Sequence, residues 1–354
     1  MKRVAVVLFN LGGPDSQTAV EPFLFNLFSD KAIITYPQPF RWVLAKIISA
    51  KRAPLAQEIY NHIGGSSPIL KLTEDQAQAL QDKLNRDLQD TQVQVFISMR
   101  YWHPFSAQTV QEVQKFGADE IVLLPLYPQF STTTTQSSFL DWDEHSSKIK
   151  LDVPTKRICC YPTQPGFIQA QVKLLKTSIE TAQASGQAVR VLFSAHGLPK
   201  KIVEQKSDPY PNQIKQGAVA IVEACKAQNI PIQDWTICYQ SRVGRLEWIG
   251  PSTEDEIIRA GQDKKALVVL PLAFVSEHSE TLVELDIEYK ELAMDHGITV
   301  YERVPAVGTH TDFIAGLSDM VCNTLNTKNA LSAQGQSKRL CNDQDQACPL
   351  SLNG

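Results

Sequence analysis

Short apolar runs alternate with longer amphipathic stretches along most of the chain. The amphipathic stretches, such as Thr73–Leu88 and Ile168–Ala184, have the period expected of helices. The apolar runs are rich in β-branched residues and are predicted to be strands: Val4–Phe9, Val93–Met99, Ile121–Leu126, Val189–Phe193, Thr236–Tyr239 and Leu267–Leu272. Nearly continuous apolar strands separated by helices are typical of parallel α/β sheets covered on both faces.

Two parts of this pattern occur twice, in the same order. Val7-Leu-Phe-Asn-Leu-Gly-Gly-Pro14 is similar to Val191-Leu-Phe-Ser-Ala-His-Gly-Leu-Pro199, and Val122-Leu-Leu-Pro-Leu126 is similar to Val268-Val-Leu-Pro-Leu272. The two motifs are farther apart in the first copy, which therefore carries an insertion. We expect two similar α/β domains with a cleft between them. Asn10 and His196 then occupy equivalent strand ends, where open α/β sheets bind ligands.

The predicted organisation has four parts. An N-terminal α/β domain spans 1–155 and contains the insertion at about 20–68, and a C-terminal α/β domain spans 156–308. A helix at 309–328 is expected to pack back on the first domain. The polar segment 329–354 is predicted to be a tail that is mobile unless something pins it.

Composition excludes several classes of protein. The net charge of −4 is no signature of polyanion binding, so we expect no nucleic-acid partner. No apolar run is long enough to cross a membrane, and Met1–Phe9 is better explained as a buried strand than as a signal sequence. Seven cysteines in a long chain are no disulfide framework, which favours a cytoplasmic protein.

The insertion mixes large apolar side chains with Arg41, Lys46, Lys51 and Arg52. One interpretation is a core helix with solvated basic positions. The other is an apolar lip that covers an apolar ligand; this lip would also touch a membrane surface.

The candidate chemistry lies in the second half of the chain. His196 follows a predicted strand, where an imidazole can be a simple turn residue, a proton acceptor or a metal ligand. A helix is predicted downstream, and its glutamates, spaced by three, four, four and three residues, fall on one face: Glu277, Glu280, Glu284, Glu288 and Glu291. This face is either a solvated acidic surface or a row of carboxylates that relays protons or hydrated cations. The residue types do not match a closed zinc site.

Two glycine-rich turns, Asn10–Pro14 and Gly64–Pro68, could bind an anion through backbone N–H groups. Neither has the spacing of a nucleotide-binding loop, and the chain lacks Gly-x-Ser-x-Gly, so a hydrolase nucleophile elbow is not expected.

Taken together, these motifs resemble the ferrochelatase family, which inserts Fe²⁺ into a porphyrin. The matching stretches run in order over nearly the whole folded part: Asn10-Leu-Gly-Gly-Pro14, Ile63-Gly-Gly-Ser-Ser-Pro68, Met99-Arg-Tyr-Trp-His-Pro104, Leu126-Tyr-Pro-Gln129, Ser194-Ala-His-Gly-Leu-Pro199, Asp208-Pro-Tyr-Pro211, Gln240-Ser-Arg-Val-Gly244, Trp248-Ile-Gly-Pro251 and Ser276-Glu-His-Ser-Glu-Thr-Leu282. Each match alone is weak, whereas the set is specific.

The resemblance implies two Rossmann-like domains with parallel sheets and the porphyrin held in the cleft between them, and it implies a role for each matched position. His196 and Glu280 are implied to be catalytic and to meet the Fe²⁺ substrate, with neutral His196 accepting pyrrole protons. The implied proton or metal path comprises Glu277, His278, Glu284 and Glu288, along a widened helix. The implied porphyrin-binding residues are Asn10, Leu11, Arg52, Tyr60, Ser67, Arg100, Tyr101 and Trp248. Leu11 stands where some members have methionine.

Some ferrochelatases hold a [2Fe–2S] cluster on one internal cysteine and three cysteines of the C-terminal tail. Here the tail contains Cys341 and Cys348, and Cys159 and Cys160 are the internal candidates. Four thiolates are the usual requirement. The alternatives are such a cluster or a tail with reduced thiols; the metal-insertion chemistry itself is expected to need no cofactor.

The expected function is insertion of Fe²⁺ into protoporphyrin IX to form protohaem. The alternatives are insertion into coproporphyrin, a porphyrin or haem carrier without catalysis, and a cobalt or nickel chelatase. The expected partners are the porphyrin, ferrous iron and, transiently, a membrane surface, so that a cytoplasmic protein associates peripherally with the inner membrane; a homodimer is among the expected states.

Overall fold

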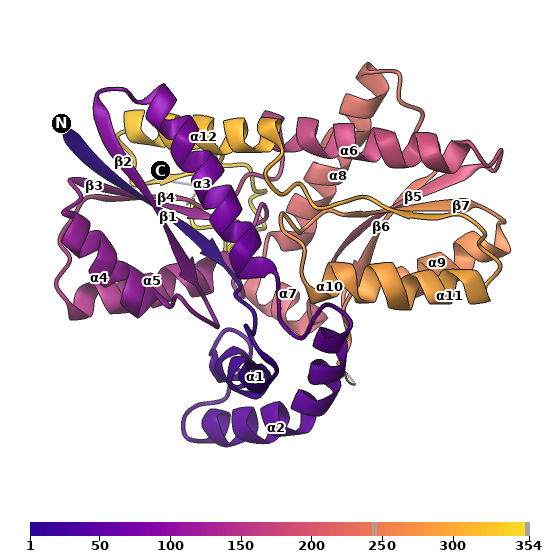
Figure 1. The fold of residues 1–354 in the computed structure, drawn as a ribbon, viewed down its shortest axis with the longest axis horizontal. Helices are drawn as coiled ribbons and strands as arrows, with labels where there is room; N and C mark the ends of the chain where they lie inside the picture. Colours follow the sequence, from indigo (N-terminus) through magenta and orange to yellow (C-terminus); the bar gives the residue numbers. More distant parts are fainter. Residues whose placement is uncertain (243, 245, 351–354) are drawn as a thin grey trace. The chain divides into compact units, whose positions relative to one another are not determined.

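The computed structural model describes residues 1–242, 244 and 246–350. The last four residues of the predicted tail, and Val243 of the Gln240–Gly244 motif, lie outside this description. The chain divides into two compact units (Figure 1). Unit 1 contains 1–160, 317–339 and the residues from 349 on, and unit 2 contains 161–316 and 340–348. The segment predicted as a separate tail is therefore shared between the units.

Unit 1 is built on a five-stranded sheet in which every pairing is parallel, in the order β2-β1-β3-β4-β9. Its strands are β1 (Lys2–Asn10), β2 (Thr91–Met99), β3 (Glu120–Pro125), β4 (Thr155–Ile158) and β9 (Leu331–Ser332). β1 lies between β2 and β3, so seven consecutive residues from Val4 to Asn10 are buried. This burial explains why the first strand is apolar without alternation.

Helices cover both faces of this sheet. The side chains of Ala5, Val7 and Phe9 pack with Val113 and Trp142 of the helices on one face, α4 and α5, and α3 packs along β2. The helices of unit 1 are η1 (Gln17–Ala19, a 3₁₀ turn), α1 (Val20–Ser29), α2 (Phe40–Asn61), α3 (Ile69–Asp87), α4 (Ser106–Phe116), α5 (Thr135–Lys148) and the end of α12 (Thr311–Asn326).

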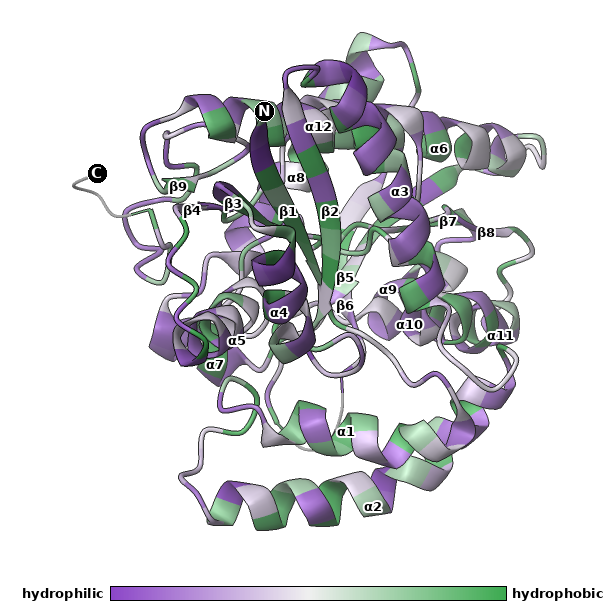
Figure 2. Cartoon of the chain, turned by 60° about the vertical axis from the view of Figure 1, so that its left-hand side comes forward, coloured by the Kyte–Doolittle hydropathy of each residue, from purple (hydrophilic) through white to green (hydrophobic). Residues whose placement is uncertain are grey.

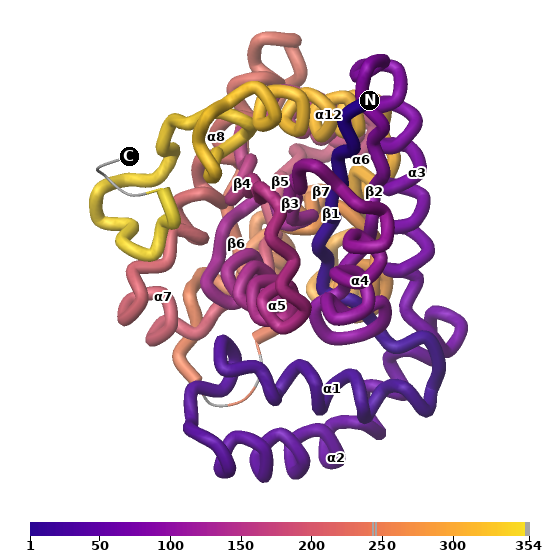
Figure 3. Tube along the Cα trace, turned by 90° about the vertical axis from the view of Figure 1, so that its left-hand side faces the viewer, coloured from indigo at the N-terminus to yellow at the C-terminus, as the bar shows by residue number. Residues whose placement is uncertain are grey.

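The predicted insertion contains the helix pair α1 and α2, which pack along each other (Figure 3). Val20, Phe23 and Leu24 of α1 form an apolar cluster with Ala53 and Tyr60 of α2. Apolar and polar residues are mixed along the length of α2, whereas β1 is apolar over most of its length (Figure 2).

Unit 2 repeats the topology of unit 1. Its four parallel strands are ordered β6-β5-β7-β8: β5 (Val189–His196), β6 (Trp235–Gln240), β7 (Ala266–Pro271) and β8 (Tyr301–Arg303). The first four strands of each unit thus have the same spatial order. The prediction of two similar parallel α/β domains is confirmed, and so is the equivalence of the strand ends at Asn10 and His196.

The helices of unit 2 also cover both faces of the sheet. Leu192 and Val269 pack with Ile257, Leu285 and Tyr289 on one face, and α6 packs against β7, β8 and α8. The helices are α6 (Pro165–Gln183), α7 (Lys200–Lys206), α8 (Tyr210–Ala227), α9 (Thr253–Gln262), α10 (Ser279–Leu282), η2 (Glu284–Glu288, a π-helix) and α11 (Tyr289–Asp295).

The segment after α12 is held by specific contacts. β9 extends the sheet of unit 1 beside β4. In unit 2, Asn212 donates to the carboxylate of Asp345 at 2.7 Å and Gln216 donates to the carbonyl of Leu340 at 3.0 Å. The segment was predicted to be mobile unless other residues held it, and these contacts hold it.

A search of the described helices found none with both the length and the apolarity needed to cross a membrane.

Candidate functional site

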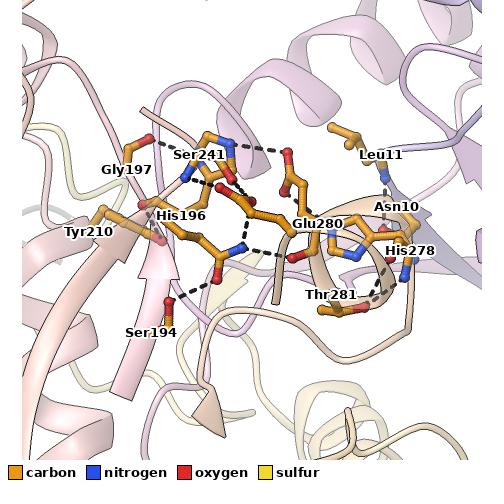
Figure 4. A network of polar contacts seen from close by, with 12 residues as sticks. Asn10, Leu11, Ser194, His196, Gly197, Tyr210, Ser241, His278, Glu280 and Thr281 are labelled. Atoms are coloured by element: carbon orange, nitrogen blue, oxygen red, sulfur yellow. Dashed lines mark hydrogen bonds and ion pairs between the residues drawn. The ribbon is translucent and has the colours of Figure 1, made fainter. Parts of the chain in front are cut away.

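His196 is the last residue of β5 and pairs in register with Gln240 at the end of β6. Its Nδ1 lies 2.6 Å from the carbonyl oxygen of Gly197, which can only accept a hydrogen bond. The proton of a neutral ring therefore stays on Nδ1, and Nε2 carries the free lone pair. Nε2 lies 3.3 Å from Oε1 of Glu280 (Figure 4).

Glu280 lies between two imidazoles. Its second oxygen, Oε2, is 3.2 Å from Nε2 of His278. His278 is buried, and its ring lies 4.6 Å from that of Phe274. The hydroxyl of Thr281 accepts from the backbone N–H of His278 and thereby fixes the start of α10. The side chains of His196 and Glu280 are 37% and 29% exposed, so a ligand can reach both.

The contact between His196 and Glu280 sets their charges. Burial disfavours the charged imidazole, but the Glu280 carboxylate and the Gly197 carbonyl outweigh this and raise the pKa of His196 to about 9. Burial also disfavours the charged carboxylate, but His196 and His278 hold the pKa of Glu280 well below its usual range. At neutral pH the pair is an imidazolium and a carboxylate. This contact favours the charged form of His196 while Glu280 is its partner, and the role of a neutral His196 as the base stays a prediction.

Glu284 is held in place by four hydrogen bonds. Its carboxylate accepts from the side chain of Gln240 at 2.8 Å, from the N–H and hydroxyl of Ser241 at 2.7 and 2.5 Å, and from the Tyr289 hydroxyl at 3.0 Å. Burial and the charge of Glu280 raise the pKa of Glu284. The hydrogen bonds from Ser241 and Gln240 lower it, but by less. Gln240 also donates to the carbonyl of Glu280 at 2.8 Å and so connects the two acidic residues.

The acidic segment is not a single α-helix. Glu277 precedes α10, and its carboxylate pairs with Arg303 at 2.5 Å and accepts from the N–H of Ala306. η2 then widens the helix, with the N–H of Glu288 bonded to the carbonyl five residues earlier. Glu288 is exposed. The prediction that five glutamates share one face is wrong, because it assumed a constant helical period. The path roles of Glu277 and Glu288 stay predictions.

Gly197 allows a close approach beside His196. A Cβ at this position would lie 2.9 Å from the carbonyl oxygen of Gln240 and 3.3 Å from Cε3 of Trp248. Trp248 is held there by strand-like pairing with Pro199. Its predicted contact with the porphyrin stays a prediction.

In unit 1, Asn10 is buried at the end of β1. Its side-chain oxygen accepts from the N–H of Leu11 at 2.8 Å, and its amide donates to the Thr73 hydroxyl at 3.0 Å. Leu11 is half-buried against the apolar cluster of α1 and α2. Asn10 therefore fixes the turn that presents Leu11.

Arg100 and Tyr101 form ion pairs and hydrogen bonds with other side chains of unit 1. The buried carboxylate of Asp30 accepts from the Tyr101 hydroxyl at 2.7 Å, from Ser137, and from Arg100 at 3.0 Å. Asp141 also pairs with Arg100, at 3.4 Å. Tyr101 is 1% exposed, so its predicted direct contact with a ligand is not available in this structure. Its hydroxyl instead ties α1 to the end of β2.

The other three predicted residues of unit 1 lie near the two glycine-rich turns or the lip. Arg52 is stacked over the ring of Phe28 at 5.6 Å, and burial lowers its pKa. Tyr60 is buried in the cluster of α1 and α2. Ser67 donates its N–H to the carbonyl of Pro14, and a Cβ on Gly13 would lie 2.5 Å from the Ser67 side chain. The turns 10–14 and 64–68 thus pack on each other.

The candidate cluster ligands are buried cysteines. In unit 1 the sulfurs of Cys159 and Cys160 are 3.5 Å apart, and in unit 2 the sulfur of Cys341 accepts from Gln213 at 3.1 Å. Within the residues that the structure describes, no three His, Cys, Asp or Glu side chains are grouped so as to hold a metal ion. A cluster on these cysteines stays a prediction.

Several residues that hold the predicted side chains in place were not predicted. In unit 2 they are Gln240, Ser241, Tyr289 and Arg303, and in unit 1 the residue is Asp30. Gln240 and Ser241 could have been found, because two polar residues directly follow an apolar strand that neighbours the strand of His196. Arg303 and Asp30 contact residues that are far away in the sequence, and Tyr289 reaches Glu284 five residues earlier across the π-helix; no local signal marks these three.

Comparison with known proteins gives a consistent family. A family model described as Ferrochelatase matches residues 3–325. The chain is 50% identical over 317 residues to a ferrochelatase of Pelagibacter ubique, covering 90% of both chains. It is 46% identical over 352 residues to a ferrochelatase of Rickettsia felis, covering 99% of both. The solved structure of SirB from Bacillus subtilis with Fe³⁺ aligns with a TM-score of 0.52 at 13% identity, over 91% of this chain and 95% of that chain; this likeness supports the fold alone.

Proposed function

Because this chain belongs to the ferrochelatase family, which inserts ferrous iron into a porphyrin in haem synthesis, we propose that His196 and Glu280 carry that reaction here, with protoporphyrin IX as the substrate. The observation that supports these roles is the position of Glu280, within 3.3 Å of two imidazole Nε2 atoms and still accessible to a ligand.

Two protons must leave the ring nitrogens of a porphyrin before a metal can bind there. In the resting pair His196 holds a proton because Glu280 is its counter-ion. A ferrous ion that approaches Glu280 replaces the imidazolium as its partner, and the pKa of His196 then falls. His196 then releases its Nε2 proton to water, because its side chain is partly exposed. The freed Nε2 can accept a pyrrole proton, while the Gly197 carbonyl keeps the ring orientation.

The first prediction tests the assigned base. His196→Ala is expected to lower the turnover of iron insertion into protoporphyrin by about 100- to 10,000-fold, because general acid–base groups contribute on this scale. Exposed His296→Ala is the matched control and should retain the wild-type rate. The measurement is a metallation assay with protoporphyrin and coproporphyrin in parallel. An unchanged rate in His196→Ala contradicts the assignment, and faster turnover of coproporphyrin by the wild type contradicts the substrate.

The second proposal concerns the lip. α2 and the loop before it expose large apolar side chains: Tyr36, Phe40, Trp42, Val43 and Ile47. Arg41 and Lys46 lie among them. An apolar surface rimmed by cations suits an anionic membrane surface from which an apolar porphyrin can be taken.

The corresponding prediction is measured by flotation with anionic vesicles in the presence of porphyrin. The wild type should float with the vesicles, and a Phe40→Asp/Trp42→Asp/Ile47→Asp variant should lose most of this association. Leu140→Asp changes an exposed leucine of α5 and should have no effect. Equal flotation of the lip variant and the wild type contradicts the proposal.

The [2Fe–2S] cluster remains a proposal that rests on Cys159, Cys160, Cys341 and Cys348. Four thiolates are available in number but are not grouped for a metal in the described structure, so no step above depends on a cluster. If the chain assembles one, anaerobically purified protein contains two irons and two sulfides per chain and absorbs visible light, and Cys341→Ser loses both. Colourless, iron-free protein contradicts it. A homodimer likewise remains a prediction.

A further inference from the structure

The hydroxyl of Tyr289 lies between two carboxylates that come from different helices. It donates to Oε1 of Glu284 at 3.0 Å. Glu254 lies in the first turn of α9, one helical turn before Ile257, which packs against Tyr289, and its carboxylate helps to raise the pKa of the phenol. Tyr289 is 5% exposed, and its ring packs with Ile257 in the core between α9 and α11. The position of the hydroxyl is therefore fixed.

The hydroxyl proton of Tyr289 can form a hydrogen bond to only one of the two carboxylates, Glu284 or Glu254. The phenol has a single O–H, which the Glu284 carboxylate uses. Oε2 of Glu254 is shielded from solvent and accepts no hydrogen bond within the described part of the chain. A buried acceptor without a donor is unfavourable. A second proton on this group of three side chains satisfies Glu254, so the arrangement is suited to take up a proton.

The far side of Glu254 reaches the surface. Glu254 lines a hollow together with Arg242, Ser252 and Asp255. On the inner side, Glu284 is joined through Gln240 to the backbone of Glu280. Hydrogen bonds thus lead from the backbone of Glu280 through Gln240 and Glu284 to Tyr289, and the unpartnered carboxylate oxygen of Glu254 is the next acceptor toward the hollow.

We propose that Tyr289 and Glu254 are the outward part of the proton route, which carries protons from Glu284 to the surface hollow at the start of α9. This inference rests on the proposed function. The O–H bond of a protonated Glu284 breaks as its proton passes to the phenol oxygen, and the phenol gives its own proton to Glu254. Glu254 then releases that proton to water.

The transfer leaves Tyr289 neutral throughout. Burial and the two carboxylates raise the pKa of the phenol far above its ordinary value, so a phenolate does not form as an intermediate. The gain and loss of a proton at the oxygen must be simultaneous. The competing route continues along the π-helix to exposed Glu288.

The test compares Tyr289→Phe and Glu254→Gln with the wild type in the metallation assay. Tyr289→Phe keeps the ring and removes only the hydroxyl. Both variants should lose about tenfold in kcat with little change in the porphyrin KM, because the proton leaves more slowly. Added imidazole buffer should restore much of the loss, since a small base can replace a missing relay group. Asp255→Asn, an exposed acid of the same hollow, should keep the wild-type rate.

The outcomes separate the two proposals. A wild-type protein that does not metallate porphyrin refutes the proposed function. If the wild type is active, unchanged kcat in both relay variants refutes the relay alone, and so does a loss that imidazole does not restore, because that loss is structural. A large loss in Glu288→Gln with none in Glu254→Gln assigns the route to the π-helix instead.

Discussion

Glu280→Gln is expected to lower the turnover of iron insertion by about 100- to 10,000-fold without unfolding the protein. Glutamine keeps the size and planarity of the side chain but removes the negative charge that lies within 3.3 Å of His196 and His278. The variant therefore loses both the counter-ion of His196 and the group that can attract the metal. The assay is steady-state metallation, with Glu223→Gln as a control because Glu223 is an exposed acid of α8. A variant with the wild-type rate contradicts the role of Glu280.

The same substitution should change the pH dependence of stability. The folded-state pKa of His196 is raised from 6.5 to about 9, so its ion pair stabilises the fold fully below pH 6.5 and is lost as the pH rises through 9. The pKa of Glu280 is lowered from 4.5, so its contribution is present above that pH and is lost only in stronger acid. The full effect therefore lies between pH 4.5 and 6.5.

In Glu280→Gln the pair is absent, and burial acts on His196 without the carboxylate. Between pH 6.5 and 9 the wild-type free energy of unfolding should fall by about 1 kcal/mol more than that of the variant, a figure reduced because solvent screens this half-exposed pair. Urea unfolding of both proteins at the two pH values measures the difference. Parallel pH profiles contradict the ion pair.

The central strands could be predicted from the sequence because both faces of each sheet are covered. Val4–Phe9 and Leu267–Leu272 are apolar at nearly every position, and this is the pattern of buried parallel strands. The short strands β4, β8 and β9, at or next to the sheet edges, were missed. They contain Thr155-Lys-Arg-Ile158 and Tyr301-Glu-Arg303, which are too short and too polar to stand out.

The site could be predicted only in part. His196 and Glu280 were identified from the resemblance, but the charge of His196 depends on a partner 84 residues away in the chain. The π-helix moves Glu284 relative to Glu280, and no spacing rule for α-helices anticipates it. Tyr101 belongs to one of the matched motifs, yet its side chain is buried, and its hydroxyl donates a hydrogen bond to Asp30 of the insertion. The π-helix is a local irregularity, whereas the charge of His196 and the burial of Tyr101 depend on contacts between distant segments.

Arg303 illustrates such a contact and supports the second large prediction. Its guanidinium makes a bidentate pair with Asp286, at 2.8 and 2.5 Å, and also pairs with Glu277 at 2.5 Å. Only 11% of the Arg303 side chain is exposed. These contacts connect β8 to both the segment before α10 and the middle of η2, so Arg303 holds the two ends of the segment that carries Glu280.

Arg303→Met is therefore expected to destabilise the protein by about 3–5 kcal/mol, because it leaves two carboxylates without their buried cation. Arg259→Met is the control: Arg259 is half-exposed and pairs with Glu256, so its loss should cost less than about 1 kcal/mol. Adding Glu277→Gln and Asp286→Asn to Arg303→Met should recover much of the stability, since no unpaired charge remains. The measurement is the urea midpoint of each variant. If Arg303→Met costs no more than Arg259→Met, or if the triple variant recovers nothing, Arg303 does not hold this segment through its charge.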